Sequence, residues 1–135
     1  MSGPVASRTY KINLSDGTAF EEKALSASKT TAALNVEGWK TLKLGLEFEH
    51  SAATAVTMTA QESDDGTVWR DVQILGDPSS GTQTSDDRTL SRAVTANKNW
   101  SWSIPIDGYV YVRCTFAGAS GDASDLLTVK GRVSA

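Results

Sequence analysis

The residues of this chain that could act in catalysis are few, and their spacing matches no catalytic motif. His50 is the single histidine, and it continues the apolar parity of Leu46 and Phe48 at the end of a predicted strand. Nucleophilic hydrolysis needs a nucleophile, a base and an orienting acid, and no local triad motif accompanies His50. We therefore expect no catalytic residue and no enzyme activity.

Three carboxylate pairs could supply hard oxygen ligands to calcium: Asp64 with Asp65, Asp86 with Asp87, and Asp122 with Asp125. None of them follows the spaced ligand pattern of a calcium loop. Aspartate in turns is explained by its bonds to nearby backbone groups. The sequence also lacks a glycine-rich phosphate loop, so we expect neither a metal nor a cofactor.

Cys114 is the only cysteine, which excludes a disulfide within the chain. It shares strand parity with Val112 and Phe116, where a small buried hydrophobe is expected, whereas Arg113 points to the other face. A reactive thiol needs a partly exposed, electropositive setting. The sequence therefore predicts a structural Cys114, and synthesis in a reducing cytoplasm.

Length and composition favour one soluble globular domain over 1–135. The net charge of −3 argues against a nucleic-acid partner, which would favour a basic stripe. No apolar run approaches the roughly 20 residues of a membrane span, and the first ten residues lack a signal-peptide core. We expect partners other than nucleic acid or membrane.

The elements that would position any site are strands, because apolar residues recur with period two. Leu42, Leu44, Leu46 and Phe48 give the clearest alternation, and similar patterns lie near 9–14, 20–25, 56–60 and 127–133. Short strands separated by turn residues predict an all-β fold, a single antiparallel β-sandwich of jelly-roll or immunoglobulin-like strand order. A possible N-terminal arm at 1–8 and a long polar loop or arm at 76–98 interrupt this pattern.

The segment 99–116 carries a strong hairpin signal, an Asp-Gly turn between two alternating runs. A three-residue loop of Ile106, Asp107 and Gly108 sorts the side chains into two faces. The inward face would hold Trp100, Trp102, Ile104, Val110, Val112, Cys114 and Phe116, and the outward face Ser101, Ser103, Pro105, Tyr109, Tyr111 and Arg113.

A second hairpin is predicted around a loop at 64–66. In that register Ala60 pairs with Arg70, Met58 with Val72, and Val56 with Ile74. Trp69 would lie on the outer face beside Gln61, unless a bulge at 69–70 turns the indole inward. The large apolar area of tryptophan favours inward burial.

Tyr109, Tyr111 and Arg113 project together from one predicted strand face, with Trp69 as a further candidate. Tyrosine, tryptophan and arginine are enriched at the centres of protein interfaces. These four residues are therefore the candidate partner interface. The alternative is that the chain's own loop at 76–99 covers this face.

The motifs at 62–69 and 108–113 resemble those of small all-β virion proteins of tailed bacteriophages, above all capsid decoration (cement) proteins. The resemblance covers 54–134. It implies a virion protein, made in the host cytoplasm, that binds the major capsid protein or other virion proteins as a homo-oligomer. A tail or neck component is the alternative within the virion.

The same motifs are also similar to those of discoidin-like carbohydrate-binding modules. The N-terminal half of this chain lacks the tryptophan-bearing sequence of that family. A carbohydrate ligand is therefore the second alternative.

Overall fold

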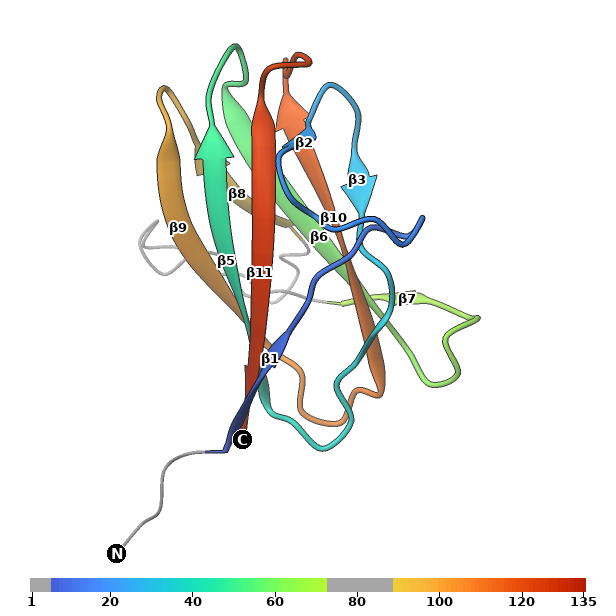
Figure 1. The fold of residues 1–135 in the computed structure, drawn as a ribbon. Coiled ribbons are helices and arrows are strands. Elements are labelled where there is room, and N and C mark those ends of the chain that lie inside the picture. The colour runs from blue at the N-terminus through green and yellow to red at the C-terminus, as the bar shows by residue number, and fades with distance from the viewer. Residues whose placement is uncertain (1–5, 73–88) are drawn as a thin grey trace, which may run out of the picture.

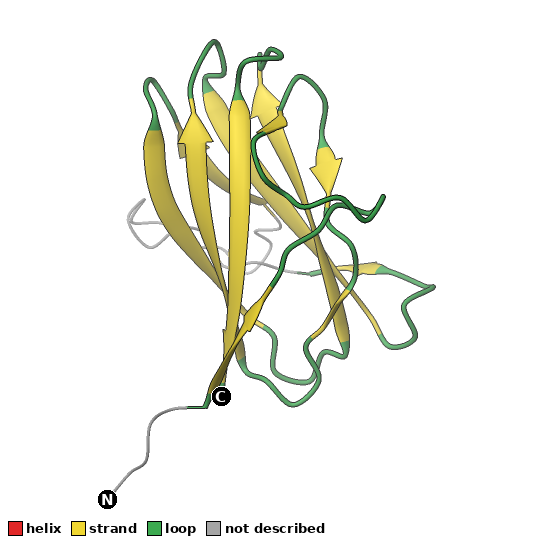
Figure 2. Cartoon of the chain, in the orientation of Figure 1, coloured by secondary structure: helices red, strands yellow, loops and turns green. Residues whose placement is uncertain are grey.

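The computed structural model describes residues 6–72 and 89–135, and these form two antiparallel β-sheets that pack face to face (Figures 1 and 2). Within these ranges there is no helix, and hence none that could cross a membrane. The prediction of an all-β antiparallel sandwich is confirmed.

The first sheet has the order β1-β11-β5-β9, and β2 pairs with the other end of β11. Its strands are β1 (Ser7–Tyr10), β2 (Lys23–Ala24), β5 (Thr41–Glu49), β9 (Lys98–Pro105) and β11 (Leu126–Ser134). The strand with the clearest alternation in the sequence, β5, therefore lies between two partners in this sheet.

The second sheet is built around β10 and β6. Two short strands pair with β10, and two others pair with β6. The bounds are β3 (Lys29–Thr30), β4 (Leu34–Asn35), β6 (Ala55–Ser63), β7 (Arg70–Asp71), β8 (Thr89–Ala93) and β10 (Tyr111–Ala119).

From β8 to β11, each step along the chain crosses from one sheet to the other. An immunoglobulin-like sandwich keeps several consecutive strands in the same sheet. Of the two strand orders left open by the sequence, the repeated crossing matches the jelly roll.

The core lies between the two sheets and is built from the inward parity of each strand. Leu42, Leu44, Leu46 and Phe48 of β5 are all buried, as the alternation predicts. Phe20 and Phe116 meet edge to face with ring centroids 5.4 Å apart. Burying one such side chain contributes about 1.5–3 kcal/mol, so this interior is the main source of stability.

The predicted hairpin at 99–116 is wrong, because its two strands belong to different sheets. β9 pairs with β5, where Trp102 lies opposite Leu44, and β10 pairs with β6, where Cys114 lies opposite Ala60. The Asp-Gly segment is a tight turn between the sheets. There the Tyr109 N–H donates to the Ile106 carbonyl at 2.9 Å, and Gly108 has a φ of 89°.

The predicted faces are confirmed for the strand residues of this segment, but Tyr109, predicted to face outward, packs partly buried against the core. Two strands in facing sheets bury the same alternate side chains as two strands of one hairpin would. The alternation alone therefore does not distinguish a hairpin from a crossing between sheets. Trp102, Ile104, Val112, Cys114 and Phe116 are buried. Trp100 and Val110 are half-buried.

The second hairpin exists, but its register differs from the prediction by two residues. Arg70 lies opposite Glu62, not Ala60, so the connection spans 63–69. A two-residue shift preserves parity, and Val72 remains buried, its N–H donating to the Ala60 carbonyl at 3.0 Å.

The predicted partners of Met58 and Val56 are also wrong, because β8 takes that edge of β6. Met58 lies opposite Leu90, and Val56 lies opposite Arg92. The predicted partner Ile74 lies outside the described residues.

Parts of the two predicted arms lie outside the described residues, namely 1–5 and 76–88. The described remainder includes regular structure. Ser7 and Arg8 belong to β1, which pairs with β11, and Thr89–Ala93 forms β8 on the edge of β6.

Candidate protein-interaction face

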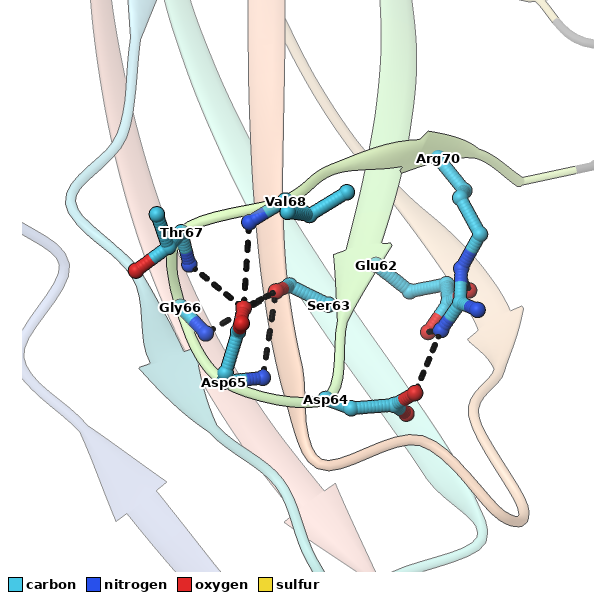
Figure 3. Close-up of polar contacts among 8 residues, drawn as sticks. All are labelled: Glu62, Ser63, Asp64, Asp65, Gly66, Thr67, Val68 and Arg70. Atoms are coloured by element: carbon cyan, nitrogen blue, oxygen red, sulfur yellow. Dashed lines mark hydrogen bonds and ion pairs between the residues drawn. The ribbon is translucent and has the colours of Figure 1, made fainter.

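The loop between β6 and β7 is organised by the Asp65 carboxylate (Figure 3). Its Oδ1 accepts hydrogen bonds from the Thr67 N–H at 2.8 Å, the Val68 N–H at 3.0 Å and the Ser63 hydroxyl at 3.0 Å. Donation from Val68, Thr67 and Ser63 lowers the pKa of Asp65. Gly66 takes the positive φ of 77° that the loop requires.

The same loop is closed by an ion-pair cluster on Arg70. Its Nε lies 2.7 Å from Glu62, and its Nη2 lies 2.9 Å from Asp64 (Figure 3). Asp64 and Asp65 therefore both act within the loop. In residues 6–72 and 89–135, no three metal-ligating side chains lie close enough together to hold a metal ion.

Trp69 lies on the outer face of the second sheet and is half-buried. The Arg113 guanidinium stacks over its ring, 4.2 Å from the ring centroid. Gln61 accepts a hydrogen bond from Arg113 Nε at 2.9 Å. The predicted inward rotation of the indole is therefore wrong, because the wider loop leaves Trp69 where it can cover a cation.

Tyr111 belongs to the same end of this face. It lies opposite Ser63 in the strand register, and a Cβ placed on Gly66 would lie 3.9 Å from its ring. Tyr109 does not join this group, because it lies in the turn before β10 and packs, partly buried, against the core. The structure thus brings together three of the four candidate residues: Trp69, Tyr111 and Arg113.

Among residues 6–72 and 89–135, the rest of this outer face consists of small uncharged side chains, apart from Asp71 opposite Gln61. In the strand register they share the outward parity of Gln61, Tyr111 and Arg113: Thr57, Thr59, Thr89, Ser91, Thr115 and Ala117. We call this surface, with Trp69, the neutral face.

The charges at the Trp69 end of the neutral face are tied together by Gln61. Its amide donates to Asp71 Oδ1 at 3.1 Å while its carbonyl accepts from Arg113. Sequence reasoning missed the Ser/Thr part of this face, although the threonines that alternate with Val56 and Met58 were a signal for it. The alternative was that the chain's own loop at 76–99 covers this face. In the described part, 89–99, β8 extends the edge of the sheet beside β6, and 76–88 lie outside the described residues.

Cys114 and His50, the two remaining residues of reactive type, lie in environments that explain them as structural residues. Burial raises the pKa of the Cys114 thiol to about 12, which keeps it protonated and unreactive at neutral pH. The His50 ring packs edge to face on Phe48, and its Nε2 lies 2.9 Å from the Ala53 carbonyl oxygen.

Asp125 is a buried carboxylate that joins two loops at one end of the sandwich. It accepts backbone N–H bonds from Ser51, Ala52, Ala53 and Asp122 at 2.6–3.2 Å. Burial alone would raise the pKa of Asp125, but these four donors outweigh burial and lower it to about 2. The donors explain its ionised state without a metal.

The fold is similar to that of known structures, although no family model and no curated protein matches the sequence. The SPBc2 prophage-derived protein YomS superposes with a TM-score of 0.55 at 16% identity, over 100% of this chain and 98% of that one. The PBSX exported protein XepA gives a TM-score of 0.50 at 13% identity over 96% of this chain, which spans only 36% of XepA. A CBM4 structure gives 0.47 at 11% identity, over 98% and 81% of the two chains.

Proposed function

We propose that this chain is a non-enzymatic structural protein of a tailed-phage virion, which decorates the capsid by bridging neighbouring capsid subunits. The observation that carries the proposal is the neutral face, an uncharged Ser/Thr surface with Trp69, Tyr111 and Arg113 at one end. It would bind the major capsid protein.

The chemistry of the neutral face suits a protein partner. Tryptophan, tyrosine and arginine contribute most of the binding energy in many interfaces. The pairing of Arg113 with Gln61 and Trp69 holds this end of the face in one arrangement, which reduces the entropy lost on binding. The exposed Thr59, Thr89 and Ser91 offer hydroxyl groups to a partner's backbone without a charge to desolvate.

The fold adds support of a weaker kind. The prophage-derived protein YomS has a similar fold over nearly the whole of both chains. In a virion, many symmetry-related copies would multiply a modest contact into a large cumulative stabilisation of the lattice. A small sandwich is sufficient for that task.

The copy number per particle tests the location. Quantitative mass spectrometry of purified particles should find copies on the order of the major capsid protein, in the hundreds. About a dozen copies or fewer would instead indicate a tail or neck component.

Binding to particles that lack the protein tests the neutral face. The double variant Trp69→Ala/Arg113→Ala should lose binding by at least about tenfold, whereas Lys11→Ala/Glu37→Ala, which changes exposed residues elsewhere, should bind normally. Unchanged binding of the first variant would exclude the neutral face. Glycan-array binding that Trp69→Ala abolishes would favour a carbohydrate-binding module instead.

A further inference from the structure

The outer face of the first sheet lies on the opposite side of the sandwich (Figure 1). Its charged side chains are separated by sign along the sheet. The outward residues of β5 run Lys43, Gly45, Glu47, Glu49, and the residues opposite the first three on β11 are Arg132, Lys130 and Thr128. All five charged side chains are exposed. We call this surface the charged face, with a basic end and an acidic end.

The basic end holds cations that the described residues do not neutralise. Lys43 and Arg132 lie directly opposite each other, and like charges in that position are destabilising. Lys130 reaches Glu47 at 3.0 Å, but within 6–72 and 89–135 neither Lys43 nor Arg132 forms an ion pair. A hollow of about 250 Å³ lies among these three cations and Gly45.

The acidic end is the counterpart of the basic end. A second hollow, of about 360 Å³, is lined by Glu22, Glu47 and Glu49 together with Asn97 and Asn99. Among the described residues, Glu22 and Glu49 have no cationic partner. The acidic end therefore carries carboxylates that could neutralise the cations of a basic end, and the basic end carries cations that could neutralise those carboxylates.

Two of the three residues in the middle of the charged face are small, and the third, Lys130, lies opposite Gly45 and pairs with Glu47. Gly45 has no side chain, and a Cβ there would only touch Lys130 Cβ at 4.0 Å. Ser101 of β9 lies directly opposite Gly45. Small central residues let another surface approach closely before the charges at the two ends meet.

We propose that the charged face pairs with the charged face of a second copy of this chain. A two-fold axis in the plane of the face and perpendicular to the strands reverses the strand direction. Such an axis sets Lys43 and Arg132 of each copy against Glu47 and Glu49 of the other. A two-fold contact must use one self-complementary patch, and the order of charges along β5, from Lys43 to Glu47 and Glu49, meets that condition.

A second copy explains the face better than an unrelated anion. An acidic ligand or nucleic acid would neutralise Lys43 and Arg132 but would meet repulsion from Glu47 and Glu49. A second copy neutralises both ends at once, and it relieves the Lys43–Arg132 repulsion in both chains.

Sedimentation velocity of the full chain tests the pairing. The protein should sediment as a dimer at low ionic strength and dissociate as sodium chloride is added, because exposed charge pairs are screened by salt. A wild-type protein that stays monomeric at millimolar concentration and low salt would overturn the proposal.

Charge reversal locates the contact. Lys43→Glu/Arg132→Glu and Glu47→Lys/Glu49→Lys should each raise the dimer dissociation constant at least about tenfold. An equimolar mixture of the two variants should form a mixed dimer, because the all-acidic face of one variant then meets the all-basic face of the other. Lys29→Glu/Lys40→Glu, which makes the same change in net charge outside the face, should leave the dimer intact.

Other results of this experiment count against the proposal. A dimer that persists after either reversal would place the contact elsewhere, and so would a mixture that stays monomeric. If a reversed variant fails to fold by circular dichroism, Lys43→Gln/Arg132→Gln repeats the test without adding charge. Sedimentation measures the free protein without particles, so its result does not depend on particle binding. The dimer can therefore be absent while the neutral face still binds particles, and the dimer can form while particle binding fails.

Discussion

At the scale of single residues, the carboxylates of this chain stabilise backbone turns. Asp65 accepts three hydrogen bonds within its own loop, and Asp125 joins two loops that lie far apart in the sequence. A buried ionised carboxylate is tolerated only when donors surround it. Of the aspartate pairs that suggested calcium in the sequence, Asp64 with Asp65 and Asp122 with Asp125 accept hydrogen bonds in their loops, and Asp86 with Asp87 lies outside the described residues.

The low pKa of Asp125 predicts an acid-sensitive fold. A carboxyl whose pKa is about 2 in the folded chain and about 3.9 when unfolded stabilises the fold fully above pH 5. That contribution falls progressively as the pH drops from about 4 to 2. Denaturant unfolding at several pH values should show the free energy of unfolding decreasing over this range.

Asp125→Asn is the matching variant. It removes the charge and turns an amide donor toward backbone donors, so it should cost about 2 kcal/mol or more at pH 7. Its free energy of unfolding should also fall less steeply between pH 4 and 2 than that of the wild type. An equally steep fall would assign the acid sensitivity to other carboxyls.

At the scale of elements, alternation in the sequence was enough to predict which side chains of β9 and β10 are buried. It was not enough to predict their pairing partners. An Asp-Gly turn between alternating runs suits a hairpin and a sheet-to-sheet crossing equally, and both bury Trp102 and Val112. The pairing partners of β9 and β10 are β5 and β6, which are distant in sequence. A local sequence pattern carries no information about such distant partners.

The candidate site was predictable to a similar degree. Tyr111 and Arg113 followed from strand parity, which is a local property. Trp69 could not be oriented, because its position depends on a loop whose width is set by the Asp65 hydrogen bonds. The sequence alone did not predict the charged face, because its residues become neighbours only through the pairing of β5 with β11, which places Lys43 opposite Arg132.

Neighbouring positions on β10 give a direct test of its facing. Val112 is fully buried, so Val112→Asp places an unpaired charge in the core and should unfold the domain. Tyr111→Asp changes an outward side chain and should cost about 1 kcal/mol. Thermal unfolding monitored by circular dichroism compares them, and a folded Val112→Asp beside an unfolded Tyr111→Asp would reverse the assigned faces.

Two glycines make a second comparison at this scale. A Cβ on Gly121 would clash with the Leu25 carbonyl oxygen, so Gly121→Ala must displace backbone and should cost about 1–3 kcal/mol. Gly45 has room for a methyl group, and Gly45→Ala should change the free energy of unfolding by less than about 0.5 kcal/mol. Equal effects in denaturant titrations would refute the close approach at Gly121.

At the scale of the whole molecule, the sandwich presents two outer faces of different chemistry. The neutral face is rich in hydroxyl groups and ends in an aromatic–arginine stack, and the charged face is divided by sign. The core separates them, so substitutions on one face should have additive effects with those on the other.

This separation predicts independent losses. Trp69→Ala/Arg113→Ala should keep the salt-sensitive dimer, and Lys43→Glu/Arg132→Glu should keep a melting temperature close to that of the wild type and its contact with particles as a monomer. On the same two variants, sedimentation measures the dimer, calorimetry measures the melting temperature, and a particle-binding assay measures the contact with particles. Loss of both functions in either variant would mean that the faces are coupled.

The position of β11 has a consequence for how the chain reaches this fold. Leu126–Ser134 lies between β1 and β5 in the first sheet, so a sheet with this order cannot close until residues up to Ser134 have left the ribosome. Pairings across such sequence separations form slowly, on a time scale of about milliseconds to seconds. Until then the apolar side of β5 lacks its final neighbour, and the exposed apolar surface makes the nascent chain prone to aggregation.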